Sequence, residues 1–352
     1  YKRQCMITMG DVIRLSQRAG FDPAQAALLM PTAPGPCRFG QYSVLQRHLL
    51  DEQGLQDFEI LSPDQGSSYR DLGEQPVRLR FLLWDGLVAV DLLQALLHRF
   101  RPYEVEQGSA DACYRQGLDR IVAAVRKKGR IVDAVRRCGE AFEALPIDDS
   151  EPRPLIGLAG EIYVRFNAYT NQDLIRRIEK LGGEVLLASM MEWLYLITWN
   201  PGFYAGLRGN YRTFLTFRLS ERYQRHREHL LTRPIVHLLR CPYETPTRTI
   251  KESVRPYLEP MVETEAVVTL GNAIELAHRG ASGILAVMPF SCMPGIVTAA
   301  IAPRLRADLG NIPWLDVSFD LQKSTNIQTR LEAFMSQARY FQRRLQLRNL
   351  AA

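Results

Sequence analysis

Residues 283–310 read GILAVMPFSCMPGIVTAAIAPRLRADLG, an apolar run that passes through a short turn into an amphipathic run. The apolar part, residues 283–290, is short and bounded by turn residues, which is typical of a buried strand. Pro294 suits the first turn of a helix, because the N–H that proline lacks would be unpaired there anyway. The segment therefore predicts a strand, a tight turn and a helix, the repeating unit of α/β proteins.

The same alternation continues along the chain. Short apolar stretches predict strands at residues 26–30, 58–61, 79–83, 155–164, 184–188, 283–290 and 314–319. Amphipathic stretches predict helices at residues 42–53, 113–128, 171–181 and 294–309. This order favours α/β layers with parallel sheets. The polar, proline-rich segment LPIDDSEPRP predicts a boundary between domains 1–150 and 151–352, and a helical insertion is expected at about 203–232.

Composition restricts the class of protein. The chain has 352 residues, 46% hydrophobic and 23% charged, which suits a folded chain of two domains. Its net charge of +6 is a weak argument for nucleic acid, and none is expected as a partner. No apolar run approaches the roughly 18 residues of a membrane helix, and no signal peptide is visible. The six cysteines form no CxxC pair, so reduced thiols in a cytoplasmic protein are expected.

Three cysteines stand just before a predicted helix. Cys292 follows the strand at residues 283–290, and Cys37 follows a loop rich in proline. Cys5 precedes a helix near the start of the sequence, although no strand comes before it. The carboxyl ends of parallel strands hold ligands, and the partial positive charge of a helix N-terminus favours the metal-binding thiolate. Arg38 adds a positive charge next to the Cys37 sulfur.

For each of these cysteines, the alternative to a metal site is that the side chain only packs in the core. Cys113 and Cys138 lie inside helical patterns and are expected to be small buried hydrophobes. Cys241 precedes a proline at a helix end, where packing and a site role are both open. The positions of the other three cysteines favour a metal site without excluding packing.

Four segments resemble a known family. They are residues 35–55 (GPCRFGQYSVLQRHLLDEQGL), 158–185, 283–305 and 314–322. They resemble, in the same order, the 2-hydroxyacyl-CoA dehydratase and double-cubane cluster proteins. The closest likeness is to the dehydratase-like C-terminal region of large activase-related proteins for CoA substrates. Met6 follows Cys5 where the family commonly has proline, and Leu321 stands where it favours glycine.

This resemblance implies a fold and a cofactor. The fold would be two Rossmann-like (flavodoxin-like) parallel-sheet domains with helical insertions and a cleft between them. An iron–sulfur cluster, either a four-iron cubane or a double cubane, would be ligated by Cys5, Cys37 and Cys292. Thiolate is the usual protein ligand of such clusters.

The resemblance also implies partners and an activity. An ATP-hydrolysing activase, as a separate chain or a fused N-terminal region, would supply low-potential electrons to a homodimer or heterodimer. The electrons would reduce or dehydrate a small or CoA-linked substrate in anaerobic metabolism. No GxxxxGK[ST] loop is present, so an electron acceptor is favoured over an ATPase. A non-catalytic accessory or regulatory domain that scaffolds an activase is the main alternative. A metal-free nucleotide-binding protein is weaker, because no GxGxxG loop is present.

Polar residues near the same sheet edge complete the predicted site. Glu161 could orient substrate or relay a proton as a catalytic acid. It could equally be a hydrogen-bonded carboxylate at a strand end, with Asn171 capping the next helix. Arg38 could tune the cluster or pair with an acid. Asp320 and Gln322 could line the cleft or only close a turn.

Overall fold

The computed structural model describes residues 3–32, 38–62, 76–127, 129–262, 264–320 and 326–351. Within these residues helices dominate, and two small parallel sheets lie among them. The coarse expectation of an α/β fold is therefore confirmed. The smaller sheet has one hydrophobic core, the larger sheet has a core on each face, and a fourth core is formed by helices.

The N-terminal lobe, residues 3–62, contains the smaller sheet. Helix α1 (Arg3–Ser16), the 3₁₀ helices η1 (Pro23–Gln25) and η2 (Arg38–Gln41), and helix α2 (Tyr42–Glu52) surround strands β1 (Ala27–Leu29) and β2 (Glu59–Leu61). The strands pair in parallel, as the sequence predicts. Their core includes Cys5, Met9, Tyr42, Leu50 and Phe58.

A helical unit follows. It contains α3 (Pro76–Phe100), η4 (Arg101–Tyr103), α4 (Ser109–Arg126), α5 (Ile131–Glu143), α8 (Met191–Leu207), α9 (Tyr211–Thr232) and η5 (Arg233–Leu238). Residues 79–83 lie in α3, so the strand predicted there is wrong. The segment predicted as a helical insertion at about 203–232 is helical, formed by the end of α8 and by α9, and its status as an insertion stays a prediction. Helices from both sides of residue 150 share one core, and the boundary there stays a prediction.

Helix α3 carries the most apolar stretch in this unit. The segment Phe81–Tyr103 is long and apolar enough to cross a membrane by length and composition, so the expectation that no such run exists is wrong. In the structure α3 packs against α4, α5 and α9. It carries Asp85, Asp91 and His98, and Asp85 forms an ion pair with Arg227 of α9. The helix therefore packs as the central core helix of the helical unit.

The larger sheet has the order β4-β3-β5-β6 with every strand parallel. Its strands are β3 (Leu155–Gly160), β4 (Glu184–Leu187), β5 (Gly283–Pro289) and β6 (Trp314–Phe319). One face packs on α6 (Ile162–Phe166), α7 (Leu174–Lys180) and α13 (Ile327–Ala351). The other packs on α10 (Thr247–Val254), α11 (Glu265–His278) and α12 (Met293–Asp308). Strand β5 is buried at every position, which explains its uninterrupted apolar sequence.

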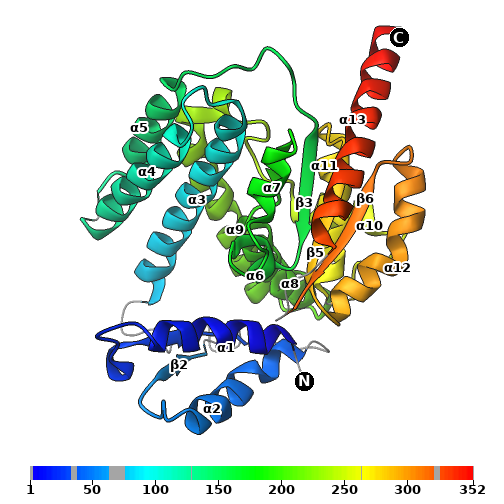
Figure 1. The fold of residues 1–352 in the computed structure, drawn as a ribbon. Coiled ribbons are helices and arrows are strands. Elements are labelled where there is room, and N and C mark those ends of the chain that lie inside the picture. The colour runs from blue at the N-terminus through cyan, green and yellow to red at the C-terminus, as the bar shows by residue number, and fades with distance from the viewer. Residues whose placement is uncertain are drawn as a thin grey trace.

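The N-terminal lobe contacts the segment that follows β3. The Asp11 carboxylate of α1 accepts hydrogen bonds from the Tyr163 hydroxyl and from Asn167 Nδ2, the latter at 2.8 Å. The Arg14 guanidinium lies 4.4 Å from the ring centre of Tyr169. In Figure 1 this lobe, in blue, lies below the sheet with α1 facing α6 and α8. The carboxyl-end side of β3 therefore faces a second α/β lobe.

Candidate functional site

The strand order creates a switch point between β3 and β5. From β3 the chain moves to β4 on one side of the sheet, whereas β5 lies on the other side. Connections that leave the carboxyl ends of two such strands run in opposite directions, and ligands of open α/β sheets bind in the crevice between them. A narrow pocket lies at this edge, where Glu161, Glu265, Thr298 and Cys292 meet.

Cys292 reaches this pocket through a left-handed turn. Ser291, two residues after the end of β5, has a φ of 64°. The Cys292 N–H then donates to the Pro289 carbonyl at 3.0 Å, and its carbonyl accepts from Ile296 at 2.9 Å. Cys292 is thus the N-cap of α12, with Pro294 in the first turn. The half-buried sulfur lies at a helix N-terminus, a position that favours the thiolate.

Glu161 caps a short helix at the same edge. Strand β3 ends at Gly160, so Glu161 follows the strand and does not lie within it as predicted. Its carboxylate accepts a hydrogen bond from the Val164 N–H at 2.9 Å, and its own N–H donates to the Val287 carbonyl at 2.8 Å. The hydrogen-bonded carboxylate that the sequence left open is confirmed. Asn171 likewise accepts from the Leu174 N–H at 3.2 Å, at the start of α7.

Glu265, the first residue of α11, was not among the residues predicted from the sequence. Burial raises its pKa from an ordinary 4.5 to about 7, the charge of Glu161 adds to the rise, and Arg165 opposes it. Glu265 therefore holds a proton near neutral pH, as a general acid or base requires. The Thr264–Glu265 pair is typical of a helix start, and only the fold brings that start to the β3–β5 edge.

Close backbone packing shapes the pocket. Gly160 has a φ of 120°, and a Cβ built there would lie 2.0 Å from the Val287 carbonyl oxygen. A Cβ on Gly295 would lie 2.4 Å from the Met288 sulfur. Both glycines therefore let α12 and β3 approach β5 closely. The buried Thr298 hydroxyl has no hydrogen-bond partner within the part of the chain that the structure describes.

The other predicted ligands are Cys5 and Cys37. The prediction that Cys5 precedes a helix is wrong: Cys5 lies within the first turn of α1, fully buried and packed with Met9 and Tyr42. Cys37 lies outside the described residues, and Arg38, which follows it in the sequence, is exposed at the start of η2. Across the described ranges no three His, Cys, Asp or Glu side chains gather as a metal site. The set of three cysteine ligands therefore stays a prediction.

The remaining cysteines and the two predicted loop residues lie outside the Cys292 pocket or outside the described residues. Cys113 and Cys138 are buried in α4 and α5, which confirms that they pack as small hydrophobes. Cys241 is half-buried beside a separate cavity. Asp320 directly follows β6, and Gln322 lies outside the described residues. Of the predicted polar groups that the structure describes, Glu161 alone lines the Cys292 pocket.

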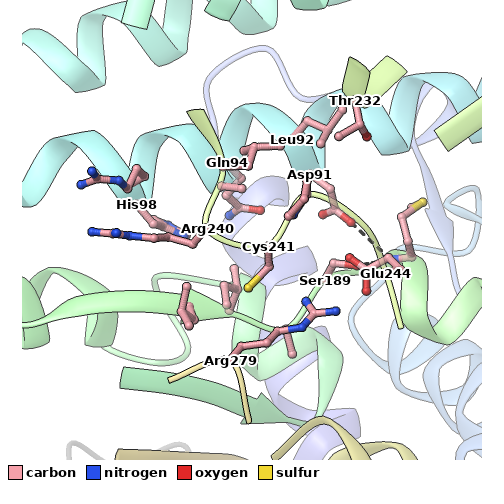
Figure 2. Close-up of a pocket in the computed structure, with 18 of the residues that line it drawn as sticks. Asp91, Leu92, Gln94, His98, Ser189, Thr232, Arg240, Cys241, Glu244 and Arg279 are labelled. Carbon is pink, nitrogen blue, oxygen red and sulfur yellow. Dashed lines mark hydrogen bonds between the residues drawn. The ribbon is translucent and has the colours of Figure 1, made fainter. Parts of the chain in front are cut away.

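A carboxylate-lined cavity of about 100 Å³ lies between α3 and β4 (Figure 2). Burial, with a smaller contribution from the charge of Glu244, raises the pKa of Asp91 to about 7 and that of Glu192 to about 8. Arg279 at the far wall donates to the Tyr243 carbonyl at 3.0 Å. A space of this size holds a few waters, which can bridge such groups. The cavity is therefore a polar, water-sized space at the interface between the helical unit and the sheet.

Comparisons with protein-family models, with curated proteins and with solved structures find no match for this chain. Function is therefore inferred from the residues and their geometry. The Cys292 pocket is the candidate site, because it joins a thiol at a helix N-terminus to Glu161 and to Glu265, whose pKa is raised to about 7, at the switch point of a parallel sheet.

Proposed function

We propose that this chain is an iron–sulfur protein of the 2-hydroxyacyl-CoA dehydratase and double-cubane group. It accepts low-potential electrons from an ATP-dependent activase and uses them to reduce or dehydrate a small or CoA-linked substrate in the cytoplasm. The observation that carries the proposal is the position of Cys292 at the N-terminus of α12, beside Glu161 and Glu265. The cluster would supply one-electron chemistry when bound.

The arrangement of the two lobes supports this proposal. Both sheets are parallel, and α1 faces the segment after β3 through Asp11. This is the arrangement expected if two Rossmann-like domains hold the cluster in a cleft between them. Cys5 of α1 and Cys37 would contribute from the N-terminal lobe, and Cys292 from the sheet edge. A dimer of such chains, or a heterodimer, would complete a double cubane.

The carboxylate pair would manage protons at this site. Glu265 holds a proton near neutral pH because it is buried and faces the charge of Glu161. The Val164 N–H fixes the Glu161 carboxylate, so the charge that raises the proton affinity of Glu265 is held in place. A reduction or a loss of water needs a proton near the reacting atoms, and Glu265 is the group in the pocket suited to donate it.

Iron loading after anaerobic purification and reconstitution tests the proposal. Wild-type protein should be brown and hold about four iron atoms per cluster. Cys292→Ala should lose most of this iron, whereas Cys113→Ala is the matched control and should retain it, because Cys113 only packs in α4. Colourless wild-type protein, or full iron in Cys292→Ala, would contradict the ligand assignment.

Turnover then separates catalysis from a scaffolding role. If an activase reduces the cluster and the reduced protein converts a CoA-linked substrate, the enzymatic proposal holds. A reducible cluster in a protein that binds the activase but converts no substrate would favour the accessory domain instead.

A further inference from the structure

Another cavity, of about 310 Å³, shares no lining residue with the Cys292 pocket. It lies between α3, η4 and α4 on one side and α6, α7 and their connecting segment on the other. Four arginines line it together with His98 and two aspartates: Arg101, Arg115, Arg165 and Arg176, with Asp111 and Asp173. Because the arginines outnumber the aspartates, the formal charge of the lining is positive, and the cavity attracts anions.

Two of the arginines are already neutralised. Arg101 donates to both oxygens of Glu179, at 2.7 and 2.8 Å, and contacts Asp111 at 3.1 Å. Arg176 donates to both oxygens of Asp111 at 2.8 Å. These bidentate pairs fix the geometry of one wall. The positive charge available to a ligand therefore comes from the other two arginines, and the Asp173 carboxylate in the lining offsets part of it.

Arg165 is the buried one of these two. Its side chain is 3% exposed, and one Nη donates to the Ser189 carbonyl at 3.1 Å. Its nearest carboxylate, Glu192, lies 3.9 Å away and has a pKa raised to about 8, mainly by burial. Burial therefore favours the neutral form of Glu192, which leaves the guanidinium charge only partly compensated by this carboxyl. Its Nε has no hydrogen-bond partner within the described part of the chain, although burying such a donor is costly.

His98 offers a second polar atom without a partner. It is 4% exposed, and its Nδ1 makes no hydrogen bond to any described residue. Burial lowers its pKa to about 3, so the ring is neutral at physiological pH and can share a hydrogen bond with a ligand oxygen. Arg115 is exposed on α4 at the same cavity and forms no ion pair with a described residue. Its flexible side chain can reach an anion from the solvent side.

We propose that this cavity binds a small phosphorylated ligand, with Arg165 and His98 contacting phosphoryl oxygens and Arg115 contacting them from the rim. A phosphoryl group carries up to two negative charges and several acceptor oxygens, which match two guanidinium groups and one imidazole. The volume exceeds that of phosphate alone and falls at the lower end of small-molecule sites. Tyr114, Phe166 and Ile175 provide apolar surface for an organic part. This inference does not depend on the iron–sulfur proposal.

Titration calorimetry of the full chain with inorganic phosphate, pyrophosphate and acetate tests it. Phosphate and pyrophosphate should bind saturably with one site per chain, and acetate at least tenfold more weakly. Arg115→Gln should weaken phosphate binding by about tenfold, the effect of one lost charge-assisted hydrogen bond. Arg136→Gln, an exposed arginine on α5, is the matched control and should bind as the wild type does. Arg165→Gln should abolish binding if circular dichroism shows that it folds.

The contradicting results are equally specific. Absence of saturable phosphate and pyrophosphate binding would overturn the proposal, and so would acetate binding of equal strength. Unchanged phosphate binding by Arg115→Gln would show that phosphate binds elsewhere, and would overturn the assignment to this cavity. Cys292→Ala should bind phosphate as the wild type does, so failure of the iron–sulfur proposal leaves this test unaffected.

Discussion

Replacing Asp91 by Asn tests how much free energy of unfolding is lost when Asp91 ionises in the carboxylate-lined cavity. One carboxylate oxygen of Asp91 accepts the N–H groups of Met190 at 3.0 Å and Met191 at 3.2 Å. An amide oxygen can accept the same two hydrogen bonds, so Asp91→Asn removes the titrating proton and keeps both contacts. Burial raises the pKa of Asp91 from an ordinary 3.8 to about 7, and the charge of Glu244 adds to the rise.

This raised pKa fixes the sign of the effect. Between about pH 4 and pH 7 the folded protein holds a proton that the unfolded chain has lost, so the free energy of unfolding falls as pH rises. Above pH 7 both states are ionised, and the penalty stays constant. A rise of this size corresponds to at most on the order of 4 kcal/mol, and relaxation around the partly exposed group reduces it. Asp91→Asn should therefore gain stability relative to the wild type as pH rises from 4 to 8.

Urea denaturation followed by circular dichroism at several pH values between 4 and 9 measures this difference. The stability of Asp91→Asn relative to the wild type should increase by a few kcal/mol across the range and level off above pH 7. Asp119→Asn, which removes an exposed carboxylate of α4, is the control and should follow the wild type at each pH. A constant difference between Asp91→Asn and the wild type would refute the assignment of a proton to Asp91.

Three further substitutions test the packing around the sites. Gly160→Ala places a Cβ against the Val287 carbonyl at a positive φ, and should lower the free energy of unfolding by about 3 kcal/mol or more in denaturation experiments. Arg101→Ala leaves the buried Glu179 carboxylate without its bidentate partner, and should cost about 3 kcal/mol by the same measurement. Asp11→Ala removes the carboxylate through which α1 contacts the segment after β3, and should speed limited proteolysis between the N-terminal lobe and the remainder. Unchanged stability in the first two, or an unchanged cleavage rate in the third, would contradict these contacts.

The larger sheet was predictable because its strands have one strong signature. Strands β5 and β6 match the predicted stretches closely. Strand β5 is buried and apolar without interruption, as expected of a central parallel strand, whereas β6 at the sheet edge is only partly buried and includes Asp316 and Ser318. The strand–turn–helix position of Cys292 followed from the same signature together with Pro294. Residues 79–83 have a similar local composition but belong to the 25-residue helix α3. A short apolar run does not by itself distinguish a strand from a segment of a buried helix.

The candidate site was predictable only where a single segment defines it. Cys292 and Glu161 each follow a strand, so the local pattern points to the sheet edge. Glu265 begins a helix far from both in the sequence, and its raised pKa arises from burial and from Glu161 across the pocket. Arg165 and His98 likewise owe their unpartnered atoms to packing between helices distant along the chain. Such properties depend on tertiary contacts that no local pattern contains.

An anaerobic crystal structure of reconstituted protein, with diffraction recorded across the iron absorption edge, tests the central claim most directly. The account predicts an anomalous iron peak at the carboxyl edge of β3 and β5, bonded to the sulfurs of Cys292, Cys5 and Cys37. Iron bound elsewhere in the molecule, or these sulfurs facing separate surfaces with no iron between them, would contradict it.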